Sequence, residues 1–133
     1  MAKSFGQMVA EAKAEVPGLS PQDAQARMQQ NPKAVVIDVR QAEDIAETGA
    51  IPGSINVPLG VLAIKADQDL PAGVTDPRLQ DRDQEVIVTC AAGGQASLGA
   101  KTLKDMGFNN VSYVDGGTRG WKSAGLPTES QGK

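Results

Sequence analysis

Cys90 is the only cysteine in this chain of 133 residues, and its neighbours are those that a nucleophile needs. Residues 85–89, just before it, form a short apolar stretch rich in β-branched residues, which predicts a buried strand. Small residues follow, and the pattern over 97–106 predicts a helix that Gly107 ends. A thiol between a strand and a helix N-terminus faces backbone N–H groups and the positive end of the helix dipole. That setting stabilises the reactive thiolate.

The residue types present limit what can assist this thiol. The chain contains no histidine, so neither a Cys–His pair nor a histidine-ligated metal site can form. One cysteine also excludes an internal disulfide and a cysteine-based zinc cluster. We therefore expect no metal and no cofactor, and we expect backbone dipoles and cations to activate Cys90.

Strands and helices alternate along the chain. Strands are predicted over 34–39, 54–57, 86–89 and 111–115. Helices are predicted over 4–15, from Pro21, over 43–47, 59–65 and 97–106, and from the turn at 116–117 through Trp121. This alternation predicts an α/β fold with a mostly parallel central sheet flanked by helices. Ligands of such sheets bind beyond the carboxyl ends of the strands, so Arg40, Cys90 and residues 117–119 should share one edge.

Composition fits one ordinary globular domain. Hydrophobic residues make up 40% of the chain and charged residues 22%, with a formal net charge of -3. The absence of a basic run argues against a nucleic-acid partner. No apolar stretch is long enough to span a membrane, and no secretory signal is recognisable, so a cytoplasmic protein is expected.

Three parts are predicted along the chain. Residues 1–16 form an amphipathic helical extension, 17–128 the main domain, and 129–133 a frayed tail. The apolar residues of the first helix recur at helical spacing. We expect this helix to pack on its own domain, and a homodimer contact is the alternative.

Four segments, in order, resemble motifs of the rhodanese-like family. They are the strand 36–40, the segment 49–58, the strand, loop and helix over 86–103, and the closing sequence 115–127 with Trp121. Ala50 stands where the family usually has histidine. The resemblance covers roughly residues 16–128 and implies the family's three-layer fold.

The resemblance also implies sulfur transfer. A loop cysteine of this family takes the outer sulfur of a donor, holds it as a persulfide and passes it to an acceptor. The implied donor is thiosulfate or a low-molecular-weight persulfide, and the implied acceptor is a thiol or cyanide. Cys90 is then the catalytic residue, and the residues whose backbone N–H groups would cradle the charged sulfur are Ala91, Ala92, Gly93, Gly94, Gln95 and Ala96.

This loop departs from the family pattern Cys-Arg-x-Gly-x-Arg-Ser. Ala91 and Gln95 replace its two cations, and Ala96 replaces its serine. A neutral loop should bind a small dianion poorly, so thiosulfate is expected to be a weak donor. We expect Arg119 to lean over the thiol and supply the missing anion affinity. Arg40 is a second substrate-binding candidate. Glu43 is its expected ion-pair partner, and Asp38, near the end of the strand 34–39, could also orient Arg40 or the loop.

Two other function classes remain open. Some enzymes of this fold accept phosphate or arsenate, but tyrosine-phosphatase chemistry requires Cys-x5-Arg, whose arginine holds the phosphate oxygens. The sixth residue after Cys90 is Ala96, so that signature is missing. The second alternative is a non-catalytic binding module, for which the neutral loop is the argument.

Overall fold

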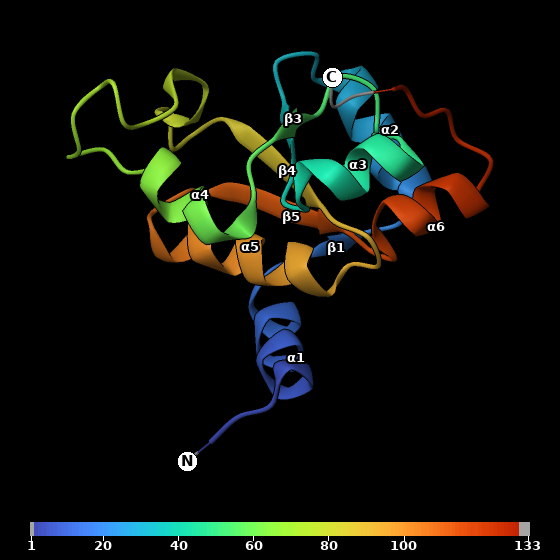
Figure 1. Cartoon of the computed structure of the whole chain (residues 1–133), viewed down its shortest axis with the longest axis horizontal. Coiled ribbons are helices and arrows are strands. Elements are labelled where there is room, and N and C mark those ends of the chain that lie inside the picture. Colours follow the sequence, from blue (N-terminus) through green and yellow to red (C-terminus); the bar gives the residue numbers. More distant parts are fainter. Residues whose placement is uncertain (1, 131–133) are drawn as a thin grey trace.

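The computed structural model describes residues 2–130 and contains one five-stranded sheet with helices on both sides (Figure 1). The strand order is β1-β5-β4-β2-β3, and every neighbouring pair is parallel. The strands are β1 Gly18–Leu19, β2 Val35–Asp38, β3 Ile55–Asn56, β4 Glu85–Thr89 and β5 Asn110–Val114. The helices are α1 Phe5–Glu15, α2 Pro21–Gln30, α3 Ala42–Thr48, α4 Leu59–Lys65, α5 Gly94–Asp105 and α6 Gly117–Ser123, with a 3-10 turn η1 at Pro77–Leu79.

The sheet separates two hydrophobic clusters. Every residue of β4 is buried, as expected for the central strand of a parallel sheet covered on both faces. Val88 packs in one cluster, with residues of α4 and α5, and Ile87 packs in the other, with residues of α2 and α6. Figure 1 shows α2, α3 and α6 on one side of the sheet and α4 and α5 on the other. The predicted three-layer α/β fold is therefore confirmed.

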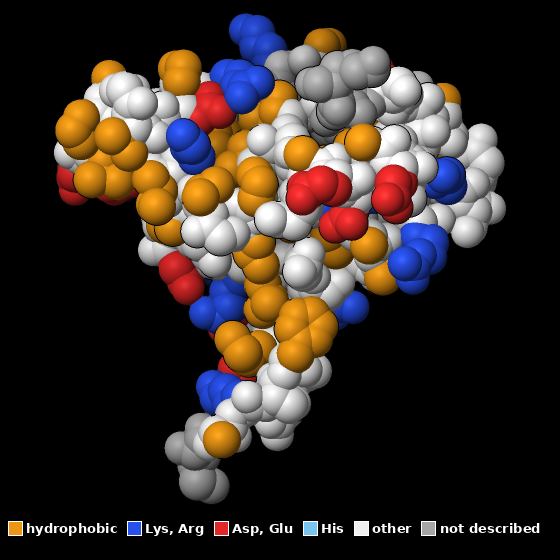
Figure 2. All heavy atoms as spheres, in the orientation of Figure 1, with side chains coloured by type: hydrophobic (Ala, Val, Ile, Leu, Met, Phe, Trp, Pro, Cys, Tyr) orange, Lys and Arg blue, Asp and Glu red, His pale blue; other side chains and the backbone are white. Residues whose placement is uncertain are grey.

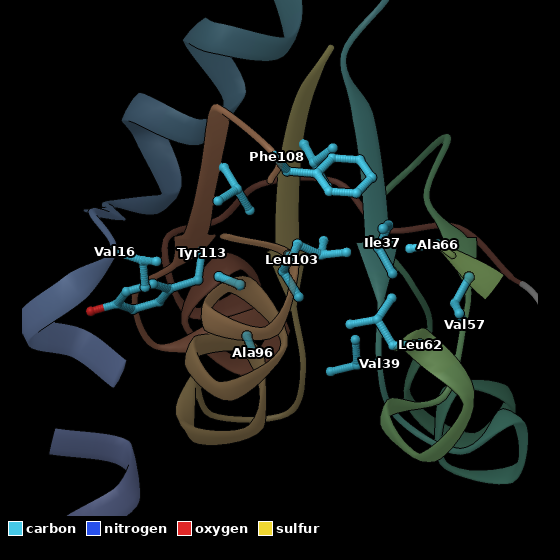
Figure 3. Packing of buried hydrophobic residues seen from close by; sticks show 14 of the residues in the cluster. Val16, Ile37, Val39, Val57, Leu62, Ala66, Ala96, Leu103, Phe108 and Tyr113 are labelled. Atoms are coloured by element: carbon cyan, nitrogen blue, oxygen red, sulfur yellow. The ribbon is translucent and has the colours of Figure 1, made fainter. Parts of the chain in front are cut away.

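Helix α1 begins at a capping box. The Ser4 hydroxyl accepts from the Gln7 N–H at 3.1 Å, and the Gln7 side chain accepts from the Ser4 N–H at 2.8 Å. Ala12 and Val16 are buried, and Figure 3 shows Val16 next to Tyr113 within the larger cluster. The predicted packing of this helix on its own domain is confirmed. A homodimer contact stays a prediction.

Two boundaries differ from those expected from sequence. Helix α5 begins at Gly94, three residues before the predicted start, because small residues that resemble a loop in sequence form its first turn. Strand β1 was not predicted, since two residues carry no periodicity, yet it pairs with β5 at the sheet edge.

The predicted frayed tail lies partly outside the described residues, which end at 130. Glu129, within them, is held in place: its backbone exchanges two hydrogen bonds with Ala50, at 2.8 and 2.9 Å. Its carboxylate also accepts from the Gly53 N–H at 3.1 Å. Among residues 2–130, no helix has the length and apolar character that crossing a membrane requires.

Candidate active site

Cys90 directly follows the carboxyl end of β4, and its side chain turns toward the first turn of α5. The sulfur Sγ accepts two backbone hydrogen bonds, from Gly93 N–H at 3.0 Å and from Ala96 N–H at 3.2 Å. Ala96 lies in the first turn of α5, where N–H groups have no partner within the helix. Only 2% of Cys90 is exposed. Two amides therefore converge on one shielded sulfur atom.

Gly93 makes this arrangement possible. It has the left-handed backbone conformation, with φ of 102°, that few residues other than glycine adopt. A Cβ atom at this position would also lie 3.1 Å from the backbone nitrogen of Gly116. The reversal at Gly93 directs the start of α5 back over Cys90.

The turn between β5 and α6 holds the Cys90 loop from the other side. Thr118 N–H donates to the Cys90 carbonyl at 2.7 Å, and Arg119 N–H donates to the Ala91 carbonyl at 3.0 Å. Gly117 has a φ of 63°, and a Cβ atom there would lie 2.7 Å from the Cys90 carbonyl oxygen. Gly116 and Gly117 were expected to serve as turn residues alone. Gly117 also allows close contact between the two segments.

Thr118 lies at the sheet edge predicted for residues 117–119, but its contacts with the end of β4 were not predicted. It is 1% exposed, and its hydroxyl lies 3.0 Å from that of Thr89, the last residue of β4. The two hydroxyls and the Thr118 N–H join the end of β4 to the start of α6. The signal available in the sequence was its position directly after the Gly116-Gly117 turn, opposite the Cys90 loop.

Arg40 has a different partner from the one predicted. Its guanidinium pairs with Asp38, through Nη2 to Oδ2 at 2.7 Å and Nε to Oδ1 at 3.0 Å. Nη1 also donates to the Thr48 hydroxyl at 2.7 Å, and Nη2 to the Gly49 carbonyl at 3.0 Å. The prediction of Glu43 was wrong because Glu43 lies on the exposed side of α3, while Asp38 is fully buried at the end of β2.

A cavity of about 320 Å³ adjoins the loop at Ala91. It is lined by Arg40, Thr48, Ala91, Thr118, Arg119, Lys122 and Ser123. Three of these side chains are cationic and none is acidic, so the cavity favours anions. Lys122 Nζ donates to the Thr48 carbonyl at 2.9 Å.

Arg119 is the one cation of this cavity whose side chain has neither an ion-pair nor a hydrogen-bond partner among residues 2–130. It is exposed, and no ion pair or side-chain hydrogen bond of its guanidinium is found among residues 2–130. The cavity lining includes Ala91 and Arg119 but not Cys90 itself. The predicted cation therefore lies beside the loop.

The predicted loop residues have four kinds of surroundings. Gly93 and Ala96 contact the sulfur, and Ala91 lines the cationic cavity. Ala92, on the loop, and Gln95, in the first turn of α5, are exposed, and Gly94 packs against α1. Thr48 and Lys122 also line the cavity and were not predicted from sequence, because only the fold brings α3 and α6 together. Within residues 2–130, no group of three or more His, Cys, Asp or Glu side chains could hold a metal ion.

Comparison with known proteins agrees with this geometry. The model of the rhodanese-like domain matches residues 20–124. The chain belongs to the rhodanese-like family. The strand that ends at the cysteine, the loop and the helix that holds its sulfur all lie inside the matched region.

Three solved structures are similar to this rhodanese-like chain. A protein of unknown function from Rhodopseudomonas palustris, described as a possible tyrosine phosphatase, is 32% identical with a TM-score of 0.89, covering 97% of this chain and 96% of its own. Thiosulfate sulfurtransferase from Pseudomonas aeruginosa is 29% identical with a TM-score of 0.75, covering 97% of this chain and 23% of its own. A homodimeric polysulfide-sulfur transferase from Wolinella succinogenes is 28% identical with a TM-score of 0.72, covering 96% of this chain and 88% of its own.

Proposed function

We propose that this rhodanese-like protein transfers sulfane sulfur through a persulfide on Cys90. The observation that carries the proposal is the convergence of the Gly93 and Ala96 N–H groups on Sγ, at 3.0 and 3.2 Å. Hydrogen bonds to an ionised acceptor are stronger than those to a neutral one, so both contacts favour a thiolate or a persulfide anion over the neutral thiol. Two similar proteins named as sulfur transferases support the same reaction class.

The reaction has two displacement steps. The Cys90 thiolate attacks the outer sulfur of a donor, the sulfur–sulfur bond of the donor breaks, and the donor leaves as a thiolate or, from thiosulfate, as sulfite. Cys90 then carries one extra sulfur. An acceptor thiolate or cyanide attacks that outer sulfur and releases the Cys90 thiolate. Each step breaks one bond and forms one, so no external oxidant or reductant is required.

We propose that the anionic part of the donor binds in the cavity beside Ala91. Arg119 is the main contact, because its guanidinium has no competing partner within residues 2–130 and the cavity contains no carboxylate. Arg40 forms part of the wall and contributes positive charge, although its donors already engage Asp38, Thr48 and Gly49.

This placement selects among donors. Thiosulfate carries its negative charge within two atoms of the transferred sulfur, where the loop offers amides and no cation. A persulfide of a larger anionic thiol can keep its sulfur at Cys90 while its carboxylates reach the cavity that Arg119 lines. We therefore propose low-molecular-weight anionic persulfides as better donors than thiosulfate, with a thiol as acceptor.

Phosphatase chemistry has less support, although one similar structure carries that description. Tyrosine-phosphatase chemistry requires an arginine six residues after the cysteine, whose guanidinium binds the phosphate oxygens. In this chain the sixth residue after Cys90 is Ala96, which is fully buried and donates its N–H to the Cys90 sulfur. We expect no Cys90-dependent hydrolysis of an aryl phosphate. A rate near that of tyrosine phosphatases would contradict this expectation.

The experiment is a cyanide assay with an anionic persulfide as donor. Wild-type protein is expected to release thiocyanate catalytically, and Cys90→Ser to lose roughly a thousandfold or more of that rate, as expected when a nucleophile is removed. Equal turnover by the variant would overturn the assignment. A folded wild-type protein without turnover would favour the binding-module alternative.

A further inference from the structure

Helix α1 lies outside the matched residues 20–124, yet its first turn touches the Cys90 loop. A Cβ atom on Gly94 would lie 3.1 Å from Phe5 Cζ and 3.6 Å from Val9 Cγ2. The first of these distances is closer than a side chain normally tolerates. The edge of the Phe5 ring therefore rests against the backbone of Gly94.

Gly94 is a sensitive point for such a contact. It is the first residue of α5 and lies between Gly93 and Ala96, whose N–H groups hold the Cys90 sulfur. Any outward movement of Gly94 would carry these two amides with it. The start of a helix is also where its backbone frays most readily, since its first N–H groups lack intrahelical partners.

Helix α1 is stabilised in different ways at its two ends. The capping box of Ser4 and Gln7 closes the first turn, which contains Phe5, through hydrogen bonds within the helix segment itself. At the other end, Lys104 Nζ of α5 donates to the Glu15 carbonyl at 2.9 Å. Figure 2 shows apolar atoms gathered where α1 meets the rest of the molecule. The Phe5 ring thus contacts the start of α5 from helix α1, which is not part of the central sheet.

The exposure of Phe5 is unusual for a residue of this type. It is 58% exposed, so the ring gains little from burial, and it belongs to neither hydrophobic cluster. The contact with Gly94 is therefore made by a residue that contributes little to core packing. Removing the ring should therefore leave the fold intact and act locally.

We propose that Phe5 is a positioning residue for the nucleophile. By resting on Gly94 it keeps the first turn of α5 in place, and with it the Gly93 and Ala96 N–H groups on Cys90 Sγ. The effect of this contact on catalysis rests on the proposed sulfur transfer. Its effect on the positions of the Gly93 and Ala96 N–H groups does not depend on that function.

The test compares amide hydrogen exchange with steady-state kinetics in the full chain. In Phe5→Ala, the Gly93 and Ala96 amides should exchange roughly three- to tenfold faster, while amides of β4 stay unchanged. With an anionic persulfide as donor, kcat should fall by a similar factor and KM should stay the same. Phe5→Leu should restore most of the slow amide exchange and most of kcat, because it restores an apolar contact.

Met8→Ala is the matched control, since Met8 is an apolar residue of the same helix, 46% exposed, that is not among the nearest contacts of Gly94. It should change neither readout. Gly94→Ala provides a second variant, because its Cβ would press on the Phe5 ring. Its effect should be larger with Phe5 present than in the Phe5→Ala background.

Three results would overturn the proposal: unchanged exchange at Gly93 and Ala96 in Phe5→Ala, an equal increase across all strands, or the same effect from Met8→Ala. Failure of the proposed function looks different. In that case no variant transfers sulfur, but the exchange rates of the two amides still respond to Phe5.

Discussion

The loop after β4 and the turn after β5 lie side by side, but they contribute different things. The first supplies the thiol and two N–H groups on its sulfur and has no charged side chain over 90–96. The second supplies two N–H groups that hold the loop carbonyls, and the cation Arg119. Nucleophile and positive charge thus occupy separate segments. Each can be altered while the other stays in place.

The two arginines of the cavity show a similar contrast. Arg40 is 6% exposed and paired with the fully buried Asp38, whereas Arg119 is exposed and has no side-chain partner within residues 2–130. The Arg40 guanidinium is already paired within the fold, whereas the Arg119 guanidinium is available to a ligand. Substitutions should therefore separate stability from binding.

The largest effect on stability is expected at Arg40. Arg40→Met would leave the Asp38 carboxylate buried without its cation, and breaking a buried pair in this way costs about 3–5 kcal/mol. Arg119→Met should change the free energy of unfolding by less than about 0.5 kcal/mol, as usual for surface substitutions. Denaturant unfolding of both variants measures this difference. Equal losses in the free energy of unfolding would mean that Arg119 stabilises the fold as much as Arg40 does.

Gly117→Ala tests the contact between turn and loop. The left-handed conformation costs about 1–2 kcal/mol for a residue with a Cβ. The clash with the Cys90 carbonyl should add about 1–3 kcal/mol and displace the nucleophile. Gly125→Ala is the control, because Gly125 has a φ of +81° but no atom within 4 Å of its Cβ position.

The comparison is again by denaturant unfolding, with sulfur transfer measured alongside. Gly117→Ala should lose both stability and transfer, whereas Gly125→Ala should lose stability alone. If both variants behave alike, the close approach of α6 to the Cys90 loop has no functional importance.

The smallest effect is expected at Arg119. For an exposed cation, Arg119→Gln should raise KM for an anionic persulfide roughly two- to tenfold, with little change for a neutral donor. Arg82→Gln is the control, since Arg82 precedes β4 and lies at the opposite edge of the sheet. An unchanged KM in Arg119→Gln, or an equal increase of KM in Arg82→Gln, would show that Arg119 does not bind the donor.

The sequence was sufficient for the positions of the main strands along the chain and for the place of Cys90 after a strand, because apolar β-branched runs and glycine turns are local signals. It placed the start of α5 three residues late, since Gly93 and Gly94 have weak helix preference and are typical of a loop. The Ala96 N–H, which was predicted from the sequence among the groups around the sulfur, therefore belongs to the first turn of α5 and not to the loop before it.

Side-chain partners were harder to predict than elements. Glu43 is close to Arg40 in sequence and was the obvious partner, but burial at the end of β2 makes Asp38 the carboxylate that needs a cation. The hydrogen bonds of Thr118 and Lys122 were not predicted, because they depend on how α6 meets the Cys90 loop and α3. Such contacts between distant segments leave no pattern in a single sequence.

The central claim is that Cys90 carries a transferable sulfur, and mass spectrometry of the intact protein tests it most directly. After incubation with an anionic persulfide, the wild type should gain one sulfur atom, located on the peptide that contains Cys90, and cyanide should remove it as thiocyanate. Cys90→Ser should gain none. A wild-type protein that stays unmodified, or an added sulfur that cyanide cannot remove, would contradict the account.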